Sequence, residues 1–111
     1  MTYRNTRIYS RSLELIELSD RILRELPTGF GFMADQLRRA ASSVTLNFAE
    51  GCGRTGKAER RRFFTIAQAS AHEVAAVLDV LDRFHAVRPE DRKSTRLNSS
   101  HSRASRMPSS A

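Results

Sequence analysis

The stretch QLRRAASSVTLNFAEGCGR, residues 36–54, decides the fold of this chain. Its apolar positions step by three and four residues, which is the spacing that places side chains on one face of an α-helix. The apolar positions are Leu37, Ala40, Ala41, Val44 and Phe48, and Met33, just before the stretch, continues the same spacing. Gly51 and Gly53 tolerate positive φ, so we expect the helix to end there and the chain to turn.

Helical periodicity also runs through residues 6–26 and 58–84, on either side of a predicted helix at about residues 32–50. Pro27 and Gly29 separate the first two helices, and we expect the loop aromatics Phe30 and Phe32 to close that end of the molecule. The apolar stripe of the last helix is too broad for one neighbour to cover. The sequence predicts an all-α, up-down-up antiparallel bundle.

Length and composition predict one small domain. The 111 residues include 19 basic and 12 acidic side chains, a net charge of +7, and a single cysteine, Cys52, which excludes an intrachain disulfide. Residues 1–92 carry +3, which is compatible with a polyanionic partner. No apolar run is long enough to span a bilayer and no signal sequence is recognisable. We therefore expect a cytoplasmic protein without a membrane partner.

Residues 93–111 differ in composition from the rest of the chain. They are rich in serine and arginine, contain no acidic residue, and offer only Leu97 and Met107 as sizeable apolar side chains. Such a segment buries too little surface to offset its conformational entropy, so we predict that it is disordered. The predicted domain is residues 1–92.

The sequence does not predict a catalytic centre, a metal site or a cofactor. Gly51, Gly56 and Lys57 have the spacing of a phosphate-binding loop, but Ala58 stands where the magnesium-binding hydroxyl is required. The three histidines are scattered, and His72 has no second histidine at position 76, as a zinc-binding helix would require. We expect a non-enzymatic protein.

A basic cluster is the feature with most functional promise. Five positive charges fall within nine residues, and two arginines on the preceding helix add to them; the seven are Arg38, Arg39, Arg54, Lys57, Arg60, Arg61 and Arg62. Cations at a helix start oppose the helix dipole, which favours an anionic partner. Three interpretations remain open: contact with nucleic-acid phosphates, a solvated face, or salt bridges to acids of a neighbouring subunit.

The residues QLRRAA at 36–41, followed by Ser43, Val44, Asn47, AEG at 49–51 and Arg54, resemble the signature of a four-helix-bundle family. These are the large-subunit ribosomal RNA intervening-sequence proteins, which include the accessory variability determinant of diversity-generating retroelements. A second segment, FFTIA at 63–67 with Ser70 and Glu73, is similar to the family's third helix. The resemblance covers about residues 3–91.

The resemblance implies several properties beyond the helix pattern. The family's fourth helix is missing here, and the tail after about Arg92 is similar to adapter or vector read-through; the competing interpretation is a genuine Ser/Arg-rich RNA-binding tail. The resemblance also implies ring-like homo-oligomers, and either binding to structured RNA or DNA without sequence specificity or service as a reverse-transcriptase accessory. Asn47, Glu50 and Glu73 lie near the apolar stripes and are expected to form buried structural polar contacts.

Overall fold

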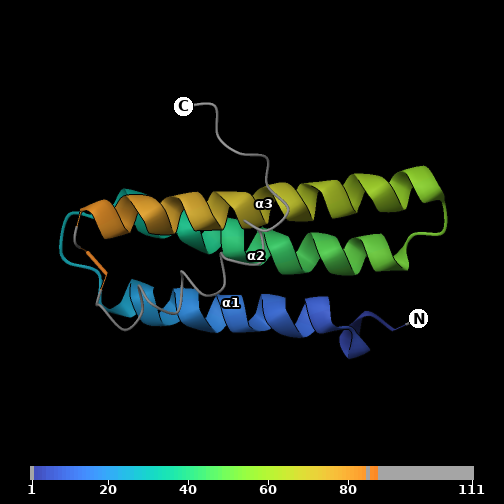
Figure 1. The fold of residues 1–111 in the computed structure, drawn as a ribbon, viewed down its shortest axis with the longest axis horizontal. Coiled ribbons are helices and arrows are strands. Elements are labelled where there is room, and N and C mark those ends of the chain that lie inside the picture. Colours follow the sequence, from blue (N-terminus) through green and yellow to red (C-terminus); the bar gives the residue numbers. More distant parts are fainter. Residues whose placement is uncertain (1, 85, 88–111) are drawn as a thin grey trace.

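The protein is an antiparallel arrangement of three long helices (Figure 1). The computed structural model describes residues 2–84 and 86–87. A short 3-10 helix, η1 (Tyr3–Asn5), precedes α1 (Arg7–Arg24), α2 (Gly31–Gly53) and α3 (Lys57–Arg83), and the described residues contain no strand. Helix α2 packs against both α1 and α3. The predicted all-α bundle is confirmed, whereas the predicted tail and two of the three histidines, His85 and His101, lie outside the described residues.

Local sequence explains where the helices begin and turn. The Thr6 side chain caps α1, because its Oγ1 accepts a hydrogen bond from the Tyr9 N–H at 3.1 Å. Between α1 and α2 the chain reverses at Gly29, whose φ of 105° is in the region that favours glycine. The predicted connection at Pro27 and Gly29 is therefore confirmed, and the observed helix bounds differ from the predicted ones by only a few residues.

The core is built where the apolar stripes of the three helices meet. Leu37 of α2 and Leu81 of α3 have no exposed surface. Around them lies one buried cluster with members from all three helices: Leu18, Ile22, Met33, Ala40, Ala41, Val44, Val74, Val77 and Leu78. Burial of this apolar surface supplies the main stabilisation of the fold.

The predicted end of the helix at Gly51 and Gly53 is confirmed, but the prediction that positive φ produces it is wrong. The helix continues to Gly53, Arg54 follows in an extended conformation, and neither glycine has positive φ. Gly51 is instead buried where α2 crosses the start of α3. A Cβ atom at this position would lie 2.6 Å from Phe64 Cε1 and 3.2 Å from Phe63 Cβ. The glycine permits close helix packing rather than a turn.

Several large apolar side chains remain on the surface. Phe30 packs against the core and meets Phe84 edge to face at 5.7 Å, as expected for a residue that closes the bundle end. Phe32 does not share this role, because 64% of it is exposed. The other exposed large apolar residues are Ile8, Leu13, Leu46, Ile66, Val80 and Phe84. The three described helices therefore leave apolar surface uncovered.

Candidate nucleic-acid interface

Charge is strongly segregated between the two ends of the bundle. The half that holds the start of α1 and the connection between α2 and α3, residues 2–15 and 42–70, carries eight basic and three acidic residues, a net charge of +5. The other half, residues 16–41, 71–84 and 86–87, carries five basic and seven acidic residues, a net charge of −2. We call the first half the basic end; it lies on the right in Figure 1.

Two arginines of the basic end lie against an aromatic ring. The guanidinium of Arg54 is 5.0 Å from the centroid of Phe63, and that of Arg62 is 5.6 Å from the same centroid. Arg54 also forms an ion pair with Glu50 at 2.6 Å. These contacts hold both guanidinium groups at the surface through cation–π attraction while leaving donors on Arg62 available to a ligand.

Arg60 has a structural role that the sequence does not reveal. Its guanidinium donates hydrogen bonds to the Arg54 carbonyl at 3.0 Å and the Cys52 carbonyl at 3.4 Å, and it lies 5.7 Å from the centroid of Phe64. Carbonyl groups at a helix C-terminus have no partner within the helix, and a cation there is favourable. Arg60 therefore caps α2 from the first turn of α3, and both hydrogen bonds come from its Nη1.

We expect Arg60→Met to lower the free energy of unfolding by about 1 kcal/mol, because the carbonyl hydrogen bonds and the cation are lost while the aliphatic stem is kept. Arg61→Met is the matched control: Arg61 is exposed and should change stability by less than about 0.5 kcal/mol. Urea unfolding followed by circular dichroism measures both. Equal stability of the two variants would contradict the capping role.

Lys57 and Arg61 are the cations of the basic end best placed to meet a ligand. Both side chains are exposed, and neither has a hydrogen bond, ion pair or aromatic partner among the described residues. They are four residues apart in α3, so they project from the same side of that helix. Of the five cations predicted around this connection, these two are fully available.

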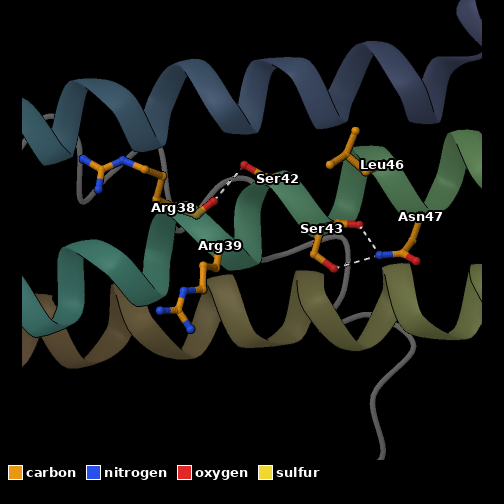
Figure 2. Close-up of a pocket in the computed structure, with 6 residues that line it drawn as sticks. All are labelled: Arg38, Arg39, Ser42, Ser43, Leu46 and Asn47. Atoms are coloured by element: carbon orange, nitrogen blue, oxygen red, sulfur yellow. Dashed lines mark hydrogen bonds between the residues drawn. The ribbon is translucent and has the colours of Figure 1, made fainter.

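Arg38 and Arg39 do not belong to the basic end. Arg54 follows Arg38 by sixteen positions along α2 and its C-cap, which is about 24 Å at the rise of an α-helix. They line an open depression of about 440 Å³ on the outer face of α2 with Ser42, Ser43, Leu46 and Asn47 (Figure 2). Arg39 extends toward α3 and Arg38 toward α1. Arg38 also forms an ion pair at 3.4 Å with Asp35 of the same helix. The seven predicted cations thus form two separate surfaces.

The three predicted structural polar residues behave differently from one another. Asn47 is half-buried, and its amide donates to the carbonyl and the hydroxyl of Ser43 at 2.9 Å each; Ser43 in turn accepts a hydrogen bond from Ser70 of α3 at 2.7 Å. Glu50 and Glu73 are exposed, so the prediction that they are buried is wrong. Each lies at the edge of its helix stripe rather than within it.

Both glutamates nevertheless have partners. Glu50 pairs with Arg54 one turn later on the same helix, while Glu73 accepts a hydrogen bond from Gln36 at 3.3 Å across the interface of α2 and α3. Surface contacts of this kind contribute at most about 1 kcal/mol each. They fix local geometry and do not place either carboxylate in an enclosed site.

The sequence reasoning missed three arginines of the basic end. Arg4 in η1 and Arg7 and Arg11 in α1 are some fifty residues from the connection between α2 and α3, but the antiparallel fold brings them to the same end (Figure 1). The contact of η1 with α2 holds this segment in place. The sequence could have revealed this, because an up-down-up order puts the start of the first helix at the same end of the bundle as the start of the third.

Other kinds of site find no support within the part of the chain that the structure describes. No group of three or more histidine, cysteine or acidic side chains is arranged to hold a metal ion there. His72 is exposed, and Cys52 is half-buried in the last turn of α2. None of the described helices has the length and apolarity needed to cross a membrane.

Comparison with known protein families gives a match that covers most of the chain. The family model described as 23S rRNA-intervening sequence protein matches residues 4–108. The chain belongs to this family. The match runs beyond Lys93, where the composition changes. The match includes the signature in α2, where Ser43 accepts hydrogen bonds from Asn47 of the same helix and from Ser70 of α3. Comparison with curated proteins gives no match.

Proposed function

We propose that this intervening-sequence protein is a non-enzymatic, cytoplasmic bundle that binds structured nucleic acid through its basic end, without sequence specificity. The observation that carries the proposal is the net charge of +5 gathered at one end of a small bundle whose other half carries −2. Lysine and arginine contacts to phosphates supply most of the affinity in sequence-independent binding. The family's name, which refers to ribosomal RNA, agrees with a nucleic-acid ligand.

The basic end offers the chemistry that backbone recognition needs. Lys57 and Arg61 are exposed and unpaired among the described residues, and Arg62 presents a planar fork held against Phe63. Arginine matches two phosphate oxygens at once, while lysine acts as a point charge. Phe63 itself is half-buried between guanidinium groups. Phosphate contact, rather than base stacking, is therefore the favoured mode.

We expect the double variant Lys57→Ala/Arg61→Ala to bind a structured RNA about tenfold more weakly near 0.1 M salt, with a smaller dependence of affinity on salt. Fluorescence anisotropy across a salt series measures both quantities. Arg38→Ala/Arg39→Ala is the control, because it removes the same charge from the other half of the bundle, and it should lower the affinity for RNA by less. Undetectable binding of the wild-type chain at low salt would overturn the proposed function.

A second role, self-association, rests on the exposed apolar residues. Leu46 is 67% exposed on α2, and Ile66 and Val80 are exposed on α3. Large exposed apolar patches mark contact sites between proteins. We propose that the chain forms homo-oligomers through such surface. Sedimentation velocity at rising salt tests this, because an assembly held by apolar burial persists where phosphate binding is lost.

The role of a reverse-transcriptase accessory is a more specific version of the same proposal. In it, the basic end holds nucleic acid while apolar surface contacts the polymerase. A reverse-transcriptase gene beside the gene for this chain, together with co-purification of the two products, would support that role. A gene position inside a ribosomal RNA operon without such a neighbour would favour nucleic-acid binding alone.

A further inference from the structure

We propose that the start of α1 carries a second site for the phosphodiester backbone, formed by Arg7 and Arg11 with Asn5 and Ser10. This inference rests on the proposed function, because the ligand is the nucleic acid bound at the basic end. The site lies outside the connection between α2 and α3 and outside all the residues that the sequence alone singled out. We call it the α1 patch.

The α1 patch is a single surface. Positions 7, 10, 11 and 14 follow the spacing that places side chains on one face of a helix. With Asn5 and Thr6 they line an open depression of about 440 Å³. The one acidic residue in its lining, Glu14, lies 4.0 Å from Arg11, and both side chains are more than half exposed, so this ion pair is weak.

Most donors of the α1 patch are not used within the protein. The side chains of Asn5, Arg7 and Ser10 are exposed and have no hydrogen-bond or ion-pair partner among the described residues. Thr6, by contrast, is fully occupied, since it accepts from the Tyr9 N–H and donates to the Tyr3 carbonyl at 2.7 Å. The recognition groups are therefore side chains rather than the helix start itself.

The charge placement is unfavourable without a ligand. Arg7 begins α1, and the first turn of this helix contains no acidic residue to offset its charge. A cation in the first turn of a helix opposes the dipole. An anion held between Arg7 and Arg11 would reverse that effect, because guanidinium groups match phosphate oxygens in geometry and charge.

The chemistry of the α1 patch specifies backbone rather than base recognition. Serine and asparagine side chains hydrogen-bond to phosphate and sugar oxygens. The two nearby aromatic residues, Tyr3 and Tyr9, are half-buried and pack edge to face on each other at 4.9 Å. Because α1 and α3 begin at the same end of the bundle (Figure 1), the α1 patch lies in the basic end that also carries Lys57 and Arg61.

The decisive experiment compares Arg7→Ala/Arg11→Ala with Arg21→Ala/Arg24→Ala, which removes the same charge from the other end of α1. Anisotropy titrations of the full chain use RNA and DNA duplexes of one sequence across a salt series. We expect the first variant to bind about tenfold more weakly near 0.1 M salt and to lower the log–log salt slope by about 2, with little change in the control.

The outcomes separate this inference from the proposed function. Weaker binding of Arg7→Ala/Arg11→Ala to both duplexes, or to the RNA duplex alone, supports the α1 patch. The comparison also shows whether the patch distinguishes the RNA backbone from the DNA backbone. Wild-type affinity in Arg7→Ala/Arg11→Ala, while Lys57→Ala/Arg61→Ala binds weakly, overturns the patch and keeps the proposed function. An equal loss in the Arg21→Ala/Arg24→Ala control also overturns it. Matching circular dichroism spectra and melting curves exclude a folding defect.

Discussion

Replacing Leu37 by alanine is expected to lower the free energy of unfolding by about 2–5 kcal/mol, which is a large part of the stability of a domain this small. Leu37 has no exposed surface and lies in the cluster shared by α1, α2 and α3. Removal of its side chain loses the transfer free energy of the buried atoms and leaves a cavity that long, rigid helices fill only in part.

Leu46→Ala is the matched control, because it makes the same chemical change nine residues later in the same helix. Leu46 is 67% exposed, so its replacement should change the free energy of unfolding by no more than about 0.5 kcal/mol. Urea unfolding of the two variants and the parent chain measures the difference. The measurement is made at a protein concentration at which the chain is monomeric, where comparable losses at both positions would contradict the contrast between a buried Leu37 and an exposed Leu46.

The helices and their order could be predicted because periodicity and breaker residues act locally. The stripe through Leu37 and Val44 and the break at Pro27 and Gly29 each depend on a few neighbouring residues. Residues at the stripe edge were harder to place, because a shift of a few tens of degrees around the helix decides burial. Glu50 and Glu73 illustrate this, since both proved exposed.

The candidate interface depends on contacts between segments distant in sequence, which local patterns do not contain. Sequence reasoning grouped Arg38 and Arg39 with the connection after α2, whereas the length of that helix separates them from it. It treated Arg60 as a free cation, although the carbonyl groups that it caps belong to the preceding helix end. Arg7 and Arg11 joined the basic end only once the antiparallel packing was known.

Gly51 is the position where sequence reasoning identified an important residue for the wrong reason, and a substitution there tests the correct one. We expect Gly51→Val to lower the free energy of unfolding by about 3 kcal/mol, at the upper end of the usual cost of overpacking. A Cβ atom would lie within 2.6 Å of Phe64 and 3.2 Å of the Phe63 Cβ, which is fixed to the α3 backbone.

The neighbouring Phe64 ring has little freedom to withdraw, because it packs against Phe48 with a centroid separation of 5.6 Å. The valine can therefore be accommodated only if α3 moves away from α2, which would also disturb the Arg60 cap. Gly53→Val provides the control, since no atom lies within 4 Å of a Cβ there and the change in helix propensity is similar. Close packing predicts that only Gly51→Val has a lower free energy of unfolding. If Gly51 only terminated the helix, the two valine variants would unfold at nearly the same urea concentration.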